Sequence, residues 1–259
     1  MEFIEKLNAL HKEWKGRLGT DYTFDGVMYH EGETEEETVR KWLDSPKRVA
    51  ILLKDQHQFN KNGETWDEPI NLWFKNVKED ADWKPDVVAH WNNGAAANRE
   101  IKSRFVKNIA CIVWGLTKIE NGAEWTYADV AANIEKVKKL INTQPFALVE
   151  CKKYPGGPAC SNTILIQHLN NYGDLLKREL ELLNPNMIVC TSGIIYERVL
   201  KMYPDDELVA IPEHNHVTYH QKSGTLIFCS YHPSARKSNA TIYEYVINNY
   251  RAFLNWLSK

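Results

Sequence analysis

The stretch Val49-Ala-Ile-Leu-Leu53, followed at once by the charged pair Lys54-Asp55, decides the fold class of this chain. Five apolar residues in a row, without the alternation of a half-buried strand, are typical of a strand buried on both faces of a parallel sheet. Three further apolar runs have the same character: Phe146–Val149, Met187–Cys190 and Leu226–Cys229. We therefore expect four buried strands at the centre of the molecule.

Helical patterns flank and separate these runs. The clearest covers residues 163–183, where leucines recur at helical spacing before Asn184-Pro185 ends the pattern. The other expected helices cover residues 2–18, 33–43, 99–115, 127–141, 193–202 and 241–258. Strands alternating with helices predict a three-layer α/β/α fold with a central, mainly parallel four-stranded sheet. Because no repeat or linker is evident, we expect residues 1–259 to form a single domain with a helical N-terminal extension at about 1–45.

The composition is that of a globular protein, with 43% hydrophobic and 25% charged residues among 259. No apolar run approaches the roughly 18 residues of a spanning helix, and the first residues lack a signal-peptide pattern, so we expect a cytoplasmic protein without membrane contact. Its five widely spaced cysteines, an odd number, favour reduced thiols over disulfides. The net charge of -2 gives no global indication of nucleic-acid binding but leaves a local basic patch possible.

Polar residues follow each apolar run, where the carboxyl ends of parallel strands meet at one edge of a sheet and form ligand sites. This edge would gather the carboxylate of Asp55, the imidazole of His232 and five basic side chains. The ordinary alternative is a set of solvated polar loops. The segments are Lys54-Asp55-Gln56-His57, Glu150-Cys151-Lys152-Lys153, Thr191-Ser192-Gly193 and His232-Pro233-Ser234-Ala235-Arg236-Lys237.

Two of these segments resemble the motifs of a known family. Val49–Asp55 resembles the first motif of the uracil-DNA glycosylase superfamily, and His232-Pro233-Ser234 is similar to its second motif. Leu148–Lys153 and Leu176–Gly193 resemble the middle section, so the likeness covers roughly residues 46–255 in order and spacing. The resemblance implies a DNA-repair hydrolase that excises uracil or another damaged base by breaking its N-glycosidic bond.

The resemblance also assigns roles. Asp55 would activate water or stabilise the sugar cation, and His232 would stabilise the departing base, because the transition state is cationic on the sugar and anionic on the base. The residues expected to bind the extruded base are His57, Phe74 and Glu150. The residues expected to bind DNA are Lys152, Lys153, Ser234, Arg236 and Lys237.

Several positions depart from the family pattern. Arg236 stands where the family has an apolar wedge that fills the vacated base stack, which makes single-stranded DNA a plausible substrate beside double-stranded DNA. His57 stands where an aromatic residue screens out thymine. The base-reading Asn falls on Ala147 or Glu150, and Glu150 would accept hydrogen bonds from an amino-bearing edge. The sequence leaves the excised base open, and Trp66 and Trp73 are alternatives to Phe74 for stacking.

The sequence contains two sets of potential metal ligands, and neither is favoured as a metal site. Cys151 and Cys160 resemble two ligands of the iron–sulfur cluster found in some relatives, but no cysteine precedes Cys111. The histidines 214, 216 and 220 alternate along a possible hairpin, for which a solvated surface is the simpler interpretation. We expect no cofactor and a monomer. The alternative functions are an inactive nucleic-acid or nucleotide-binding module of the same fold and, less favoured because no GxGxxG follows a strand, an unrelated Rossmann-like enzyme.

Overall fold

A computed structural model describes residues 2–19, 22, 24–30, 32–57, 104–119, 125–141, 143–156 and 160–259. Within these residues the chain is an α/β protein with a mixed seven-stranded sheet in the order β1-β3-β2-β4-β7-β6-β5. The predicted α/β class is confirmed. The four apolar runs form the central strands, and neighbours among them are parallel: β2 (Val49–His57), β3 (Phe146–Gly156), β4 (Met187–Cys190) and β7 (Thr225–Cys229).

The prediction of a four-stranded sheet is wrong in the number of strands. Antiparallel strands extend both edges: β1 (Gly26–Val27) pairs with β3, and β5 (Leu208–Ile211) and β6 (His214–His220) extend the sheet beyond β7. A two-residue strand leaves no sequence pattern. Strand β5 is partly exposed, and β6 alternates polar and apolar residues. Neither strand therefore gives the signal of a continuous, buried apolar run.

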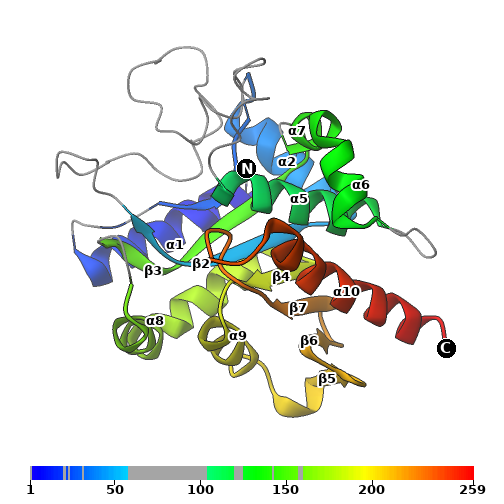
Figure 1. Cartoon of the computed structure of the whole chain (residues 1–259). Coiled ribbons are helices and arrows are strands. Elements are labelled where there is room, and N and C mark those ends of the chain that lie inside the picture. Colours follow the sequence, from blue (N-terminus) through cyan, green and yellow to red (C-terminus); the bar gives the residue numbers. More distant parts are fainter. Residues whose placement is uncertain are drawn as a thin grey trace.

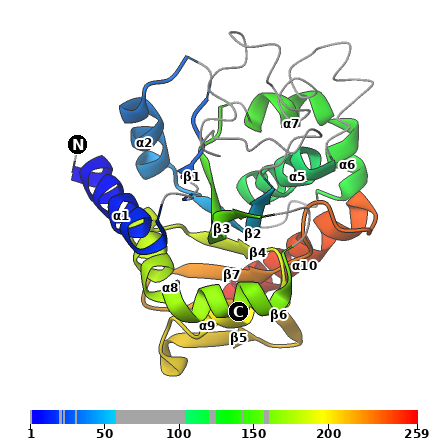
Figure 2. The same cartoon turned by 90° about the vertical axis from the view of Figure 1, so that its left-hand side faces the viewer.

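Helices cover both faces of the sheet, and each face has its own apolar core (Figure 1). The first core lies under α5 (Arg104–Lys118), α6 (Tyr127–Ala132), α7 (Ile134–Ile141) and α10 (Asn239–Leu257). The second core lies under α1 (Glu2–Leu18), α8 (Asn162–Leu183) and α9 (Gly193–Leu200), and it includes Trp42 of α2 (Glu35–Asp44). Figure 2 shows α1 beside α8, and a short 3-10 helix, η2 (Asp205–Glu207), precedes β5.

The helix predictions agree with the structure apart from two details. The pattern at 127–141 is two helices, because Asn133 caps the end of α6 with a non-helical backbone (φ −107°, ψ 25°). The predicted helix at 99–115 overlaps α5, and residues 99–103 lie outside the described ranges. The described helices include none that combines the length and apolarity needed to cross a membrane.

Alternation along the strands decides which side chains share a face of the sheet. In β3, Leu148 belongs to the first core and Val149 to the second. Continuing this alternation places Glu150 and Lys152 on the first face and Lys153 on the second. The same reasoning in β2 places Asp55 on the first face, with Ile51 and Leu53.

Candidate functional site

Asp55 and Lys152 form a buried ion pair near the carboxyl ends of β2 and β3. The two residues are register partners, and Lys152 Nζ lies 3.2 Å from Asp55 Oδ2. Their side chains are only 3% and 9% exposed, with Lys152 the more buried. Lys152 Nζ also donates to the carbonyl of Tyr154 at 2.6 Å and lies 3.9 Å from the centre of its ring. The ammonium thus compensates the charge of Asp55 inside the site. The prediction that Lys152 binds DNA is corrected, because its side chain is buried against Asp55.

His232 follows β7 at the same edge of the sheet. The backbone N–H of Ser234 donates to His232 Nδ1 at 3.1 Å, so in a neutral ring the proton sits on Nε2. Burial, and next the positive charge of Lys54, lower the pKa of His232. The ring is therefore neutral at neutral pH and presents an Nε2–H donor.

Helix α5 supports the loop that carries His232. Asn108 Nδ2 donates to the carbonyl of Pro233 at 2.7 Å, and the Phe105 ring centre lies 5.8 Å from that of His232. Neither residue is predicted from the sequence. A buried asparagine on an apolar helix carries no local signal of its partner, since that partner lies 125 residues away in the chain.

The strand order places Asp55, near the end of β2, and His232, just after β7, at the same edge of the sheet. Strand β4 separates β2 from β7, so their ends are about 10 Å apart, two strand spacings. The effect of Lys54, the neighbour of Asp55, on His232 agrees with this proximity. A carboxylate and a neutral imidazole donor therefore lie at the same edge of the sheet.

Glu150 is a second carboxyl group at this edge. It is the register partner of Leu53, two residues before Lys152 on the same face, and is 2% exposed. Among the described residues, no group makes a hydrogen bond to its Oε2. Burial, and next the negative charges of Asp25 and Asp55, raise its pKa well above the ordinary value.

Three positively charged residues lie in the segments beside the site: Lys54, Arg236 and Lys237. We call them the basic rim. Arg236, Lys237 and the neighbouring Ser234 are exposed in the loop after β7. Lys237 Nζ lies 5.5 Å from the ring centre of Tyr231, and Lys54 donates to Asn162 Oδ1 at 3.0 Å.

Lys153 does not belong to this rim. It is wholly buried on the other face of the sheet, where its ammonium lies 2.5 Å from Asp25 Oδ1 and 2.9 Å from Glu179 Oε1. The predicted DNA contact of Lys153 is corrected, because its side chain is out of reach of a phosphate. Burial lowers the pKa of this lysine, but the two carboxylates raise it by more, so the net direction is upward.

Some predicted residues lie outside the described part of the chain. The backbone of His57 belongs to β2, but its side chain is not described. Phe74, Trp66 and Trp73, and residues 157–159, lie outside the described ranges altogether. For these residues the sequence predictions stay predictions.

The histidines and cysteines that the sequence offers as potential metal ligands have different surroundings in the structure. His216 lies against Tyr245, with ring centres 4.8 Å apart, whereas His220 bonds to Ser223 and Glu207. The Cys151 thiol is buried in the second core. Within the ranges that the structure covers, no three His, Cys, Asp or Glu side chains are grouped as ligands of one metal ion.

A Ser–His–Glu chain exists elsewhere, but its hydrogen bonds run the wrong way for a nucleophile. His220 lies between Ser223 Oγ, at 2.6 Å from Nδ1, and Glu207 Oε2, at 2.8 Å from Nε2. Ser223 donates its proton to Thr225 Oγ1, which donates to the carbonyl of Pro185. His220 Nδ1 therefore donates to Ser223 instead of accepting its proton, and the chain fastens the turn before β7.

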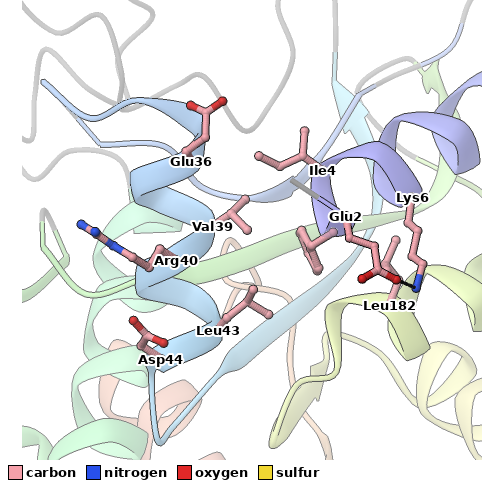
Figure 3. A pocket seen from close by; sticks show the side chains of 10 residues that line it. Glu2, Ile4, Lys6, Glu36, Val39, Arg40, Leu43, Asp44 and Leu182 are labelled. Atoms are coloured by element: carbon pink, nitrogen blue, oxygen red, sulfur yellow. Dashed lines mark ion pairs between the residues drawn. The ribbon is translucent and has the colours of Figure 1, made fainter.

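A cavity of 480 Å³ lies between α1 and α2, away from these groups (Figure 3). Ile4, Val39 and Leu43 form apolar walls, and the Glu2–Lys6 ion pair, 2.6 Å long, lies on α1 beside them. None of the predicted site residues lines it. The candidate site is therefore the carboxyl edge with Asp55, Glu150, Lys152 and His232.

Comparison with known proteins assigns no family to the chain. No family model matches it, and no curated protein is significantly similar to it. Functional inference rests on the site itself.

Proposed function

We propose that this protein is a DNA base-excision glycosylase of the uracil-DNA glycosylase type. One observation carries the proposal: a buried carboxylate, Asp55, and a neutral histidine donor, His232, stand at the same carboxyl edge of parallel strands. We further propose that the three-layer arrangement around β3, β2, β4 and β7 corresponds to the core of that superfamily, with β1, β5 and β6 as additions at its edges.

The proposed reaction hydrolyses the bond between C1′ of the sugar and the nitrogen of the base. As this bond breaks, its electron pair leaves with the base and positive charge develops on the sugar. Asp55 would stabilise that charge and orient the water whose oxygen bonds to C1′, while the Nε2–H of His232 donates to the oxygen of the departing base. One proton of the water ends on the released base or in solvent.

The proposed partner is DNA that carries a damaged base. The exposed Ser234 hydroxyl and the side chains of Arg236 and Lys237 flank His232 in the chain, where phosphates next to an extruded nucleotide would lie. Arg236 offers a guanidinium plane in place of an apolar wedge, which is compatible with stacking on the bases of a single strand.

One observation favours the second candidate, a binding module without catalysis. The ammonium of Lys152 already compensates Asp55, and this lowers the negative potential that would stabilise a sugar cation. The two candidates differ in a single readout, which is release of the base.

The test uses single- and double-stranded oligonucleotides that carry uracil, hypoxanthine, xanthine or hydroxymethyluracil, followed by alkaline cleavage of abasic sites. We expect excision of at least one base by the wild-type protein and a loss of about 100-fold or more in Asp55→Asn. Asp174→Asn is the matched control, because Asp174 is an exposed carboxylate that pairs with Arg17 on α1. Binding without excision would select the second candidate, and full activity of Asp55→Asn would overturn the assignment of Asp55.

A further inference from the structure

A cavity between α8 and α9, on the second face of the sheet, plays no part in the catalytic scheme above. Figure 1 and Figure 2 show the two helices side by side, and the cavity, which we call the α8–α9 groove, has a volume of 380 Å³. Its apolar lining residues, Leu169 and Met202, pack against the second core. None of the residues of the candidate site lines it, so a ligand here would be independent of the proposed excision chemistry.

Three cationic side chains line the α8–α9 groove. Lys177 comes from α8, Arg198 from the last turn of α9, and Lys201 from the position that caps this helix. A favourable interaction with the dipole of α9 accounts for Arg198 and Lys201 but not for Lys177 on the neighbouring helix. Three positive charges at one cavity attract an anion that carries several negative charges.

The acidic residues nearby do not cancel this charge. Asp174 also lines the groove, but its carboxylate lies 2.6 Å from the guanidinium of Arg17 and supplies no hydrogen-bond donor to an anion. Glu181 lies 3.8 Å from Lys177, and because both side chains are exposed this pair contributes little. No acidic side chain in the described part of the chain forms an ion pair with the other two cations of the groove.

Asn170 fixes the guanidinium of Arg198 at the groove. Both residues line the cavity, and Arg198 Nη1 donates to Asn170 Oδ1 at 2.7 Å. A guanidinium has five N–H donors, and the described residues accept only this one hydrogen bond from Arg198. The remaining donors are available to a ligand. Their planar fork matches two oxygens of a phosphate group.

Gly173 leaves open space in the groove. It lies in the interior of α8, and a Cβ at this position would meet nothing within 4 Å, so no neighbouring atom requires a glycine. Its φ is not positive, so the backbone does not require one either. Glycine is less favourable than alanine inside a helix. A ligand that occupies the space beside Gly173 would explain why this position carries no side chain.

We propose that the α8–α9 groove binds a chain of two or more phosphates, as in inorganic pyrophosphate or the phosphate chain of a nucleotide. Three cations from two helices match such a chain better than a single phosphate, which carries about two negative charges. Arg198 would bind two oxygens of one phosphate, and Lys177 and Lys201 would compensate the next. The cavity also has the size of a small-ligand site.

Isothermal titration calorimetry of the full chain with pyrophosphate, ATP and AMP tests this proposal. We expect one site for pyrophosphate or ATP and weaker binding of AMP, which has a single phosphate. Gly173→Leu fills the groove without changing a charge and should weaken binding about tenfold or more. Lys201→Ala should also weaken binding about tenfold. The control Lys136→Ala removes the same charge from an exposed position on α7 and should leave the affinity unchanged.

Circular dichroism should show that Gly173→Leu is folded, because its position is open and leucine favours a helix. The absence of pyrophosphate and ATP binding to the wild-type protein would overturn the proposal, as would equal affinities of the wild type and Gly173→Leu. Binding lost on replacement of Arg236 and Lys237 instead would overturn it too, since the anion would then lie at the basic rim. Tighter binding of ATP than of pyrophosphate would assign the phosphate chain to a nucleotide, and the reverse order would assign it to the inorganic anion. These outcomes do not depend on base excision.

Discussion

Replacing Glu179 by Gln tests the buried charge cluster that anchors β3 behind the site. Asp25, Lys153 and Glu179 are each wholly buried, and they combine one cation with two carboxyl groups. The cluster is electrically neutral only if one carboxyl group keeps its proton. Burial, and next the negative charge of Asp25, raise the pKa of Glu179 to about 8 against the lowering effect of Lys153.

The sign of the pH effect follows from where the proton is held. The folded protein keeps the Glu179 proton up to about pH 8, while the unfolded chain releases it near pH 4.5. Between these values folding takes up a proton, so raising the pH reduces the free energy of unfolding. At about 1.4 kcal/mol per pH unit, the contribution of Glu179 falls by up to about 5 kcal/mol across this window.

The assay is urea denaturation at pH 5, 6.5 and 8, followed by tryptophan fluorescence, because Trp14 lies against Lys153. The quantity to compare is the stability of Glu179→Gln minus that of the wild type, which cancels other titrating groups such as His11 and His168. We expect this difference to grow by several kcal/mol from pH 5 to pH 8. The control Glu181→Gln, an exposed carboxylate on the same helix, should show no growth. A constant difference for Glu179→Gln would refute the neutral-acid description of the cluster.

Three further predictions concern packing, positioning and DNA contact. Gly115→Ala would place a Cβ 2.6 Å from a side-chain methyl of α10 and should lower the free energy of unfolding by about 1–3 kcal/mol. A Cβ at Gly173 would meet nothing within 4 Å, so Gly173→Ala should raise the free energy of unfolding by about 0.5–1 kcal/mol. Thermal unfolding measures both changes. Asn108→Ala removes the hydrogen bond that holds the His232 loop and should slow excision about tenfold with circular dichroism unchanged. Replacing Arg236 and Lys237 together by Ala should weaken DNA binding for every sequence and lower the slope of log affinity against log salt by about 1–2, measured by fluorescence anisotropy.

The central strands could be predicted because burial on both faces leaves an uninterrupted apolar run, as in Val49–Leu53. The edge strands could not be predicted in this way. In β6, the polar residues Thr218 and His220 alternate with Val217 and Tyr219 although both are buried, so the strand has no continuous apolar run and the pattern indicates a loop or hairpin. The position of the candidate site could be predicted because the carboxyl ends of parallel strands meet at one edge of the sheet. In the structure, Asp55 and Lys152 form an ion pair at this edge.

The error over Lys153 has a definite origin. Two adjacent lysines after an apolar run usually lie in solvent, but β3 continues to Gly156, seven residues beyond the apolar run. In a continued strand, neighbours face opposite sides, so Lys152 turns to Asp55 and Lys153 turns to Asp25 and Glu179. The length of a strand depends on its neighbours in the sheet, which a local sequence pattern does not contain.

The most direct test of the central claim is a hydrolysis measurement in ¹⁸O-labelled water. A single-stranded oligonucleotide with one uracil or hypoxanthine is incubated with excess protein, and both products are weighed by mass spectrometry. Water attack at C1′ beside Asp55 predicts an abasic strand that carries one ¹⁸O and an unlabelled free base, with the yield lost in Asp55→Asn and kept in Asp174→Asn. An oligonucleotide of unchanged mass for every base tested would contradict the account.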